Sequence, residues 1–573
     1  MYLPKKWDVN KYDQSLVEKI SSELKIMKIT AEVLMSKGIS SVEKAEFFLN
    51  PGLNMLYDPF LLPDMKKAVD RIRKAIAGKE KILVYGDRDV DGITAVVIML
   101  ETLKELGADC MYFVPMEEAY SVQKEIIDRY KKQGVSLIIT VDCGIKSIEE
   151  VEYAGKLGID IIITDHHEAM EELPGAVALV NPKIKSSNYP FREIAGCTVA
   201  FKTCLALYRS FAESGKTGND KLFINRYLDL LALGSIADIV PLIDENRVIV
   251  KNGLFYLMNT KRIGLRLLME YCMKQSDFTK LTASDISWKI VPPLNASGRM
   301  GNASVSCELM LTENTAEAEE LLKEIMTLNS RRKSSQEKSL EIVNSIIHEQ
   351  CNILEDKIFV ISSHEIDKRI AGIIASHIMQ EYYRPVIVLR EEGDEVVGSA
   401  RSVETFNIEN ALQSCGDLLT RYGGHKFAAG LSMKKDNVNE FRKRIGDYAN
   451  DKLTEEDLIP RVMIDHILDA SQVTDSLMEE VNSMEPFGYF NSSPVFAIYG
   501  AMLDRNMVGW KNGNNLRIRL KDNNLEGFGW GLGVLSKELQ KVSKVDIVFN
   551  LVTNYWDGKK YLRLLIKDIR PVE

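Results

Sequence analysis

Four short segments concentrate the side chains that could do chemistry. Three are DRDVDG at 87–92, the lone acid Asp142 in TVDCG, and DHHE at 165–168; the fourth, LALGSIAD, ends at Asp238. Carboxylate oxygens with one or two imidazoles suit Mn²⁺ or Mg²⁺ better than a thiolate zinc site does. Two such ions about 4 Å apart can share a water and brace the leaving oxygen of a phosphoester. Any one segment alone is also compatible with an acidic loop, but together they predict a metal-dependent phosphoesterase centre with one or two ions.

Strands must position these acids. Short apolar runs at 81–85, 136–141 and 159–164 each lead into an acidic segment, and 93–106 has helical periodicity. Alternating strands and helices at this spacing predict an α/β domain with a doubly wound parallel sheet. Ligands of such sheets bind outside the carboxyl ends of the strands, so the acidic segments are expected at one crevice. Asp142, isolated at its strand end, is the candidate for a ligand shared by two ions.

The rest of the chain is expected to form further domains. Residues 307–350 are rich in Glu, Lys, Leu and Ile without Pro or Gly, which is typical of a long exposed helix joining two lobes. A second α/β pattern follows, with strands expected at 357–361 and 386–389. After about 455, short β runs with Gly and Asn turns suggest a small barrel of the oligonucleotide-binding (OB) type. These runs are at 515–520, 545–552 and 561–566.

Composition narrows the class of protein. The 573 residues suffice for roughly three to five domains of ~100–200 residues each. With 45% hydrophobic and 27% charged residues, the chain is typical of globular proteins, which excludes a disordered or fibrous one. No apolar run approaches the ~20 residues of a membrane span, and MYLPKKWDVN lacks the apolar stretch of a signal peptide. Eight scattered cysteines without a Cys-x-x-Cys pair indicate reduced thiols. We therefore expect a cytoplasmic protein with no membrane partner and no organic cofactor.

Charge is unevenly distributed along the chain. The net charge is −9, yet residues 501–573 contain 13 Lys and Arg against 8 Asp and Glu. A basic C-terminal segment on an acidic body suits an enzyme that holds metal with carboxylates and a polyanion with a separate module. Chance variation of the surface would give the same count, so charge alone leaves both interpretations open.

A family resemblance rests on these and further motifs. DxDxDG, TVDCG, TDHHE and LALGSIADIVPL resemble the DHH phosphoesterase superfamily. The remaining motifs resemble, in order and spacing, those of the RecJ family of bacterial single-strand-specific 5′→3′ DNA exonucleases, and the match runs from about 80 to the C-terminal end. They are NPK at 181–183, LNASGRMG at 294–301, GSARS at 398–402, GGHKFAAG at 423–430, and EPFG at 485–488 with Asn491 and Pro494.

The resemblance implies an architecture. In this family a DHH lobe and a DHHA1 lobe enclose a narrow channel, a long helix links them, and an OB-type barrel follows. Residues 1–80 precede the match, and their own pattern predicts an N-terminal helical extension. Carried over, the resemblance predicts a DHH domain at 81–305. A connecting helix at 306–350, a DHHA1 domain at 351–452 and an OB-type domain at 453–573 complete the prediction.

The resemblance also implies metal ligands. By motif, Asp89 would hold the first metal ion and Asp91 the second. Asp142 would bridge the two ions, and His166 and Asp238 would complete the second site. The implied cofactor is Mn²⁺ or Mg²⁺.

Further roles follow by motif. His167 would face the scissile phosphate, Asp165 would orient the histidine pair, and Arg299 would contact phosphate through its planar guanidinium. Four residues of the DHHA1 lobe resemble those that grip phosphate and ribose: Ser399, Arg401, Gly424 and His425. Residues of the barrel that could stack on bases or contact the backbone are Trp510, Lys511, Arg517, Arg519, Phe528 and Trp530, each of which is equally compatible with core or solvated surface.

Four segments depart from the family pattern. Tyr85 stands where a histidine is usual, and a neutral phenol is a poor metal ligand at pH 7. The Arg and Gly-Tyr-Gly stretch is replaced by MEEAYSV at 116–122. Pro293 replaces an arginine, and IDKRI at 366–370 replaces a Trp-His-x-Gly-Val stretch.

Three functions are therefore compared. The favoured one is a metal-dependent exonuclease that degrades single-stranded DNA from its 5′ end to 5′-mononucleotides, in recombination and repair. The alternatives are a phosphodiesterase for short oligonucleotides, against which the C-terminal barrel argues, and a catalytically weak nucleic-acid-binding protein, which the departures favour. Single-stranded DNA is the expected partner, with a helicase or single-strand-binding protein as further candidates.

Overall fold

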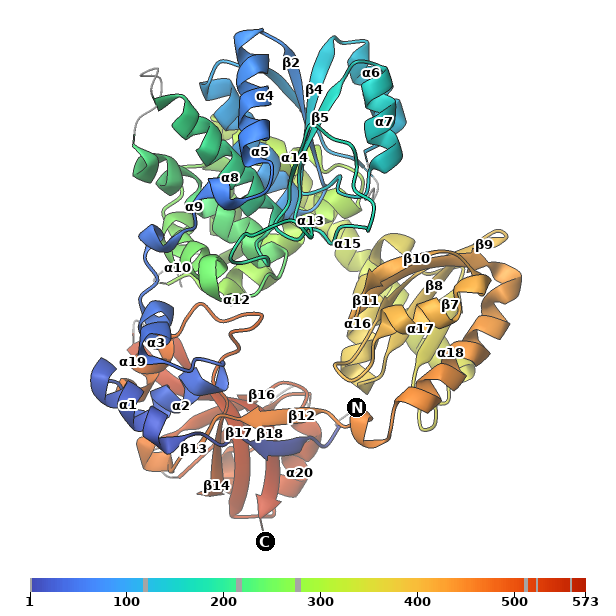
Figure 1. The fold of residues 1–573 in the computed structure, drawn as a ribbon. Coiled ribbons are helices and arrows are strands. Elements are labelled where there is room, and N and C mark those ends of the chain that lie inside the picture. Colours follow the sequence, from blue (N-terminus) through green and yellow to red (C-terminus); the bar gives the residue numbers. More distant parts are fainter. Residues whose placement is uncertain are drawn as a thin grey trace.

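The computed structural model describes residues 3–116, 122–212, 219–273, 280–509, 514–521, 524–556 and 559–572. They form three lobes, each with its own β-sheet (Figure 1). In the part of the chain that the structure describes, none of the helices combines the length and the hydropathy needed to cross a bilayer.

The first lobe is built on a parallel five-stranded sheet. Its strands alternate between two hydrophobic cores, so they read as continuous apolar runs. This confirms the doubly wound sheet expected from the sequence. In spatial order the strands are β3 (Asp109–Phe113), β2 (Lys81–Gly86), β4 (Val135–Val141), β5 (Asp160–Thr164) and β6 (Ala178–Val180). The helices on one face are α4 (Met65–Ala77), α5 (Val90–Glu105), α8 (Gly196–Ser210) and α9 (Asp220–Ala237); those on the other are α6 (Lys124–Lys131) and α7 (Ile148–Lys156).

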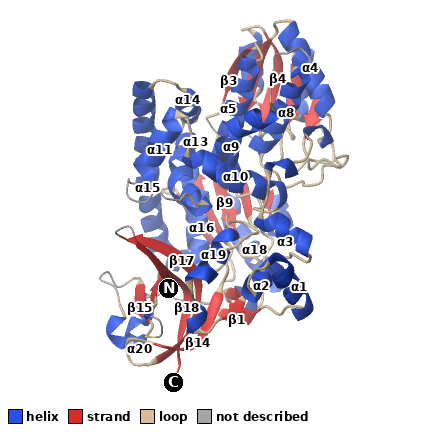
Figure 2. Ribbon diagram, turned by 90° about the vertical axis from the view of Figure 1, so that its left-hand side faces the viewer, coloured by secondary structure: helices blue, strands red, loops and turns tan. Residues whose placement is uncertain are grey.

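A helical layer extends this lobe and leads to the next. It contains α10 (Asp244–Met258), α11 (Ile263–Met273), α12 (Ala283–Asp285), η4 (Ile286–Ile290), α13 (Val291–Arg299) and α14 (Ser304–Leu311). The helix expected over 307–350 is divided, because the Asn314 side chain accepts the N–H groups of Ala316 and Glu317 and thereby starts a new helix. That helix, α15 (Thr315–Gln350), runs beside α11 and α14 (Figure 2) and reaches the second lobe.

The second lobe has a mixed sheet covered unequally by helices. Its strands are, in order, β10 (Leu419–His425), β11 (Ala428–Lys434), β9 (Glu395–Arg401), β8 (Val386–Glu392) and β7 (Phe359–Ser363), with only β7 and β8 parallel. Helices α17 (Ile408–Ser414) and α18 (Val438–Lys452) cover one face, and α16 (Ala371–Tyr382) packs against the β7, β8 and β9 part of the other.

The third lobe is a curved sheet of mostly antiparallel strands. Its order is β13 (His466–Ile467), β14 (Phe496–Met502), β17 (Lys544–Trp556), β18 (Lys559–Val572), β16 (Glu526–Gly529) and β15 (Leu516–Arg519). A bridge between Leu503 and Leu520 joins the chain just beyond β14 to the end of β15. Helices α19 (Asp475–Ser483) and α20 (Ser536–Leu539) complete this lobe.

The first 80 residues divide between two lobes. Helices α1 (Gln14–Leu24), α2 (Lys28–Ser36) and α3 (Val42–Leu49) share a hydrophobic core with the third lobe, whereas α4 packs into the first. Strand β1 (Lys6–Val9) pairs in parallel with β12 (Arg461–Ile464). Figure 1 accordingly shows the N-terminal helices beside the C-terminal strands. The domain boundaries expected from the sequence stay predictions, but the apolar cores join the two ends of the chain.

Candidate active site

The acidic segments meet at the switch point of the parallel sheet. Strands β2 and β4 are neighbours, yet the chain leaves them toward opposite edges, to β3 and to β5. Crevices form where connections diverge in this way. Asp87, Asp89 and Asp91 follow β2, Asp142 follows β4, and His166 follows β5.

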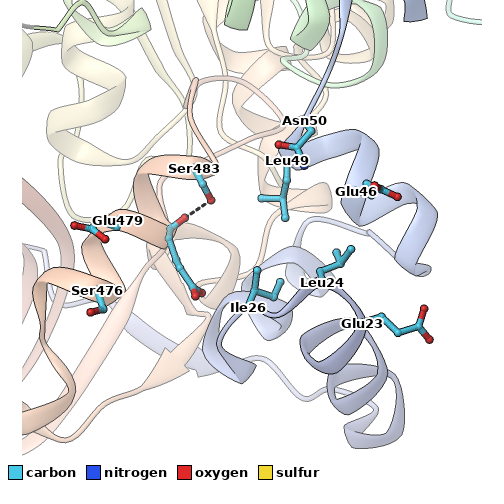
Figure 3. A pocket seen from close by; sticks show the side chains of 10 residues that line it. Glu23, Leu24, Ile26, Glu46, Leu49, Asn50, Ser476, Glu479 and Ser483 are labelled. Atoms are coloured by element: carbon cyan, nitrogen blue, oxygen red, sulfur yellow. Dashed lines mark hydrogen bonds between the residues drawn. The ribbon is translucent and has the colours of Figure 1, made fainter.

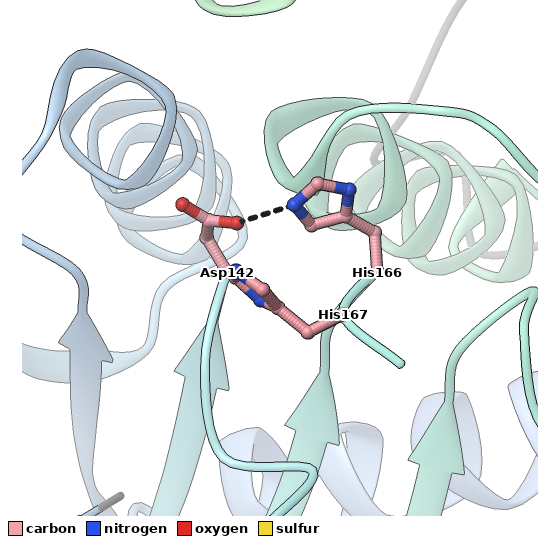
Figure 4. A group of neighbouring side chains, drawn as sticks. All are labelled: Asp142, His166 and His167. Carbon is pink, nitrogen blue, oxygen red and sulfur yellow. Dashed lines mark ion pairs between the residues drawn. The ribbon is translucent and has the colours of Figure 1, made fainter. Parts of the chain in front are cut away.

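His166 stands among three carboxylates. Its Nε2 lies 3.2 Å from Asp142 Oδ1, an ion pair that Figure 4 shows. It also lies 3.6 Å from Asp238 Oδ2 and 3.9 Å from Asp91 Oδ2. Burial, with the neighbouring His167 charge, lowers the pKa of His166 to about 4. The imidazole is therefore neutral at pH 7, and a neutral ring adds no positive charge to the three carboxylates. Such a donor set suits Mn²⁺ or Mg²⁺.

A second group of carboxylates shares Asp142. Oxygen atoms of Asp87, Asp89 and Asp142 lie within 4.8 Å of one another. Burial and the adjacent acids raise the pKa of Asp87 to about 7 and that of Asp142 well above its ordinary value. Asp87 was not among the ligands predicted from the sequence, although the same DxDxDG spacing offered it. The two groups provide two places for a cation, with Asp142 common to both.

The environment of Asp142 fits a cation. Its Oδ1 is buried and makes no hydrogen bond within the described part of the chain. Buried polar atoms are rarely left in that state. The residue also has a φ of 62°, an uncommon left-handed conformation for a residue other than glycine. An orphaned carboxylate oxygen among other acids is what a divalent ion would satisfy, so the residues present fit the expected metal.

Helix starts fix two further acids. Asp91 Oδ2 accepts the N–H of Gly196 at 2.7 Å and Oδ1 accepts that of Cys197 at 2.9 Å, both in the first turn of α8. Burial and Asp238 nonetheless raise the pKa of Asp91 to about 6. Asp89 caps α5 by accepting the N–H groups of Asp91 and Gly92. Both carboxylates are therefore positioned by backbone groups.

His167 is held by Asp165. Asp165 Oδ1 lies 2.8 Å from His167 Nδ1, and its Oδ2 accepts the N–H of Ile145 at 2.9 Å. Burial alone would lower the pKa of His167, but Asp165 raises it to about 9, so the ring is cationic at pH 7. In return, His167 holds the pKa of Asp165 well below its usual range, against the effect of burial. One adjacent histidine is thus neutral and the other charged.

Arg299 contributes to a contact between the first two lobes. Its Nη1 donates to the carbonyl of Arg369 at 3.4 Å. The helix that ends at Arg299 approaches the acidic loop closely, since a Cβ at Gly298 would lie 2.4 Å from Arg88 O. Asn295 Oδ1 accepts the N–H of Val90 at 3.0 Å. The NASGR motif therefore packs directly against the DxDxDG loop.

Three of the four residues predicted in the DHHA1 lobe share one open face. In the register of β9, β11 and β10, Arg401 and His425 flank Ala428, and Ser399 lies opposite Gly430. Small residues between them leave a flat floor beside the start of α16. A Cβ at Gly372 there would lie 2.7 Å from Arg401 Nη2.

Gly424 differs from these three. A Cβ at this position would meet Ala428 O at 2.3 Å and Ala429 Cα at 2.5 Å. Gly424 therefore serves close packing between β10 and β11. The exposed Gly423 is the glycine that lies on the open floor, in register with Gly430.

The third lobe presents three arginines around one glutamate. Arg517 and Arg519 each donate to Glu526 Oε1 at 2.9 Å, and Arg563 donates to Oε2 at 3.1 Å. These contacts lower the pKa of Glu526 although burial opposes them. No sequence signal indicated that Glu526 would accept hydrogen bonds from three arginines, because only the register of the strands brings these residues together.

Aromatic rings lie next to this cluster. Phe528 is opposite Arg517, and it makes an edge-on contact with Trp530 at 4.6 Å between ring centroids. The Trp530 side chain is 70% exposed. Trp510 and Lys511 lie outside the described residues.

The structure shows the surroundings of the residues that depart from the family pattern. Tyr85 is buried against Phe113, and burial raises the pKa of its hydroxyl, so it remains a neutral phenol. Pro293 lies in the first turn of α13, where backbone N–H groups have no helical partner. Of the 116–122 segment, residues 117–121 lie outside the described residues.

The 366–370 segment forms part of the lobe contact. Asp367 accepts hydrogen bonds from Ser335 at 2.7 Å and from Arg369 Nη2 at 2.8 Å. Burial would raise the pKa of Asp367, but these bonds lower it to about 2. The adjacent Arg369 carbonyl receives Arg299. The changed residues therefore connect the long helix α15, the second lobe and Arg299.

A surface cavity lies elsewhere, between the N-terminal helices and α19 (Figure 3). Its volume is about 620 Å³. Its lining includes Glu23, Glu46, Glu479 and Glu480, and none of the predicted site residues. Four acids make this cavity unsuited to a polyanion. It is therefore separate from the candidate active site.

Comparison with protein families gives three matches. The model of the DHH family, N-terminal domain, matches residues 81–235. The DHHA1 domain matches 355–451, and the RecJ OB domain matches 464–568. The three matches follow the three sheets in order and confirm the fold class expected from the sequence.

Individual proteins match over most of their length. The chain is 36% identical to the single-stranded-DNA-specific exonuclease RecJ of Bacillus subtilis, covering 98% of this chain and 70% of that protein. It is 31% identical to the protein of that name from Dickeya dadantii, covering 91% and 93%. The solved structure of RecJ from Thermus thermophilus in complex with Mn²⁺ matches with a TM-score of 0.84 at 28% identity, over 99% of this chain and 80% of that one.

Proposed function

This chain belongs to the RecJ family of single-stranded-DNA-specific exonucleases, and from that premise we propose that it hydrolyses single-stranded DNA from the 5′ end, releasing 5′-mononucleotides. It is a metal-dependent hydrolase that uses Mn²⁺ or Mg²⁺. The observation that carries the proposal is the orphaned Oδ1 of Asp142 between two groups of acids. The OB-type domain favours a long strand as substrate over short oligonucleotides.

Two metal positions are proposed. Asp91, His166 and Asp238 would hold one ion, Asp87 and Asp89 the other, and Asp142 would contact both. When bound, the ions supply Lewis-acid polarisation of the phosphate and acidify a water molecule. His166 suits this role because it is neutral at pH 7. Asp142 suits it because its Oδ1 accepts no hydrogen bond from any of the described residues.

The protein side chains would stabilise charge on the scissile phosphate. His167 is cationic at pH 7, and Asp165 fixes its ring through Nδ1, so its Nε2–H is available for a phosphate oxygen. Arg299 would add a guanidinium from the neighbouring helix. Ser399, Arg401 and His425 would bind phosphate and sugar farther along the strand, on the open floor of the second lobe.

The wider setting is also a proposal. Single-stranded DNA would extend onto the third lobe, where Arg517 and Trp530 offer charge and a stacking surface. A helicase or single-strand-binding protein would supply such strands during recombination and repair. The eight cysteines are all free thiols, which is compatible with a cytoplasmic location.

The test is degradation of a 5′-phosphorylated single-stranded oligonucleotide by the purified protein with Mn²⁺, with DNA binding recorded in parallel. Mononucleotide release that disappears in Asp142→Ala, while binding persists, would support the proposal. Strands blocked at the 5′ or the 3′ end would establish the direction. Cleavage confined to very short oligonucleotides would favour the phosphodiesterase alternative, and binding without cleavage would favour a catalytically weak binding protein.

A further inference from the structure

Two aromatic side chains project from the loop that contains the EPFG motif. Tyr489 is 46% exposed and Phe490 is 61% exposed, and their rings meet edge-on with centroids 4.8 Å apart. The metal centre and the proposed strand-binding residues do not include them. Single exposed apolar side chains are ordinary on a protein surface, whereas adjoining ones are a feature of binding surfaces.

The loop holds this pair in a strained conformation. Phe490 has a φ of 59°, which is unfavourable for a bulky residue. Gly488 and Asn491 exchange backbone hydrogen bonds around it at 2.9 and 3.1 Å, and the Asn491 amide donates to the carbonyls of Met484 and Pro486. Strain of this kind persists only where the surroundings enforce it and is concentrated at functional sites.

The catalytic lobe anchors the loop at both ends. The N–H of Leu242 donates to Tyr489 O at 2.8 Å, and Arg247 donates through Nη2 to Glu485 O at 3.1 Å. Arg247 is fully buried, and its guanidinium lies 3.6 Å from the centre of the Phe48 ring. The aromatic pair is therefore fixed to the first lobe although its segment belongs to the third.

The anchor point is close to a proposed metal ligand. Leu242 follows Asp238 by four residues, so the connecting backbone spans at most about 14 Å. This upper bound, which runs to the anchor point and not to the rings, corresponds to about four stacked nucleotides at ~3.4 Å each. Ile239, within this connection, is 67% exposed and has a φ of 58°, which is a rare conformation for a β-branched residue. Ile239 and Phe490 are thus both exposed apolar residues with a left-handed backbone, and the hydrogen bond from Leu242 to Tyr489 joins their two segments.

We propose that Tyr489 and Phe490, with Ile239 beside the metal centre, form a stacking step for unpaired bases of the substrate strand. The inference rests on the proposed function, because it assigns the strand as the occupant. The short connection from the proposed ligand Asp238 to Leu242, which binds the Tyr489 carbonyl, favours this occupant over a protein partner. Aromatic faces accept every base, which suits an enzyme that degrades a strand regardless of its sequence.

The test uses single-stranded DNA with 2-aminopurine at one of the first positions from the 5′ end, bound in EDTA. Stacking on an aromatic ring changes the emission of this base. Wild-type protein should change the emission at one or two positions within about four nucleotides of the 5′ end. Phe490→Asn should abolish that change and weaken binding about 10-fold, since asparagine tolerates the left-handed backbone but has no ring.

Controls separate stacking from folding. Phe255→Asn removes another exposed phenylalanine, 63% exposed and in edge-on contact with Tyr256, and should leave the emission and binding unchanged. Phe490→Trp should restore the signal. If DNA bound to wild type and to Phe490→Asn had the same 2-aminopurine emission, with both proteins folded by circular dichroism, the proposed base stacking would be overturned. Because the binding is measured in EDTA, absence of nuclease activity would overturn the proposed function without deciding this inference.

Discussion

The carboxylate of Asp142 lies against the bare Cα of Gly196: a Cβ at position 196 would come within 2.1 Å of Asp142 Oδ1. The same glycine donates its N–H to Asp91 Oδ2 at 2.7 Å. The first turn of α8 thus contacts an acid from each of two neighbouring strand ends. Glycine is required here by close approach to the acids, and its φ is not in the left-handed region. The geometry of the metal centre therefore depends on a residue with no side chain.

Gly196→Ala should lower kcat at least about 10²-fold and weaken Mn²⁺ binding, because the methyl group must displace Asp142. Steady-state cleavage and calorimetric Mn²⁺ titration would measure the two effects. Gly155→Ala is the matched control, since a Cβ at this helical glycine meets nothing within 4 Å. That variant should keep its activity and gain up to ~1 kcal/mol of stability. Wild-type metal affinity in Gly196→Ala would contradict the proposed role of Asp142.

Asp142→Asn should have opposite effects on stability and on activity. Burial and like charge raise the pKa of Asp142, so its ionised form is costly in the metal-free protein. A neutral amide removes that cost, and we expect the free energy of unfolding in EDTA to rise by about 1–2 kcal/mol. Cleavage should be lost because the shared ligand is weakened.

Urea unfolding in EDTA and the nuclease assay would check both effects. Asp109→Asn, at an exposed position of β3, serves as the control and should change neither. If Asp142→Asn instead destabilised the metal-free protein, the ionised carboxylate of Asp142 would not be unfavourable in the fold.

The sequence was sufficient for the parallel sheet and for the order of its acids. Strand-end positions of Asp89, Asp142 and His166 follow from short apolar runs, whose period and length are local properties. The second lobe follows in the same way from the α/β pattern after residue 350, and the resemblance implied the metal-ligand role of Asp238. Asp87, which we propose as a further ligand, was not predicted from the sequence, because spacing alone does not tell which acids of DxDxDG point to the same side.

Contacts between segments that are distant in the chain could not be predicted from the sequence. The packing of α1 to α3 with the third lobe brings together residues more than 400 positions apart, and no local pattern encodes it. Removing the residues after 455 would therefore expose the apolar faces of these helices, so such a truncation would not test strand binding by the third lobe alone. Glu526 likewise acquires its role only through the register of β15, β16 and β18.

The stability of the metal-free protein should fall as the pH rises from 5.5 to 8. The folded-state pKa values of Asp91, Asp87 and Asp238 are about 6, 7 and 7, above the usual ~3.9 of an unfolded aspartate. Groups raised in this way stabilise the fold when protonated and lose that contribution as the pH passes their folded pKa. His167, raised to about 9, acts in the same direction above pH 6.5. We expect a loss on the order of 3 kcal/mol in EDTA.

Mn²⁺ should reverse this trend, because it binds the ionised carboxylates. The stabilisation by saturating Mn²⁺ should therefore be larger at pH 8 than at pH 5.5, as measured by urea unfolding at both values. His166, whose pKa is lowered to about 4, opposes the trend below pH 6.5 but is a single group. Asp238→Asn should flatten the dependence in EDTA. A Mn²⁺ effect that does not vary with pH would count against a carboxylate metal centre.

Arg517→Ala tests strand binding by the third lobe. Three arginines surround Glu526, so these four side chains together have a net charge of +2. If Arg517 contacts one phosphate, the plot of log K against log salt concentration should become less steep by about 0.7. Fluorescence anisotropy with a long single strand measures this slope.

Arg266→Ala, which removes an exposed arginine on α11, is the control and should leave the slope unchanged. Turnover of a very short oligonucleotide should be unaffected in both variants, because only a longer strand extends to the third lobe; an equal loss for short and long strands would instead place Arg517 in support of the fold.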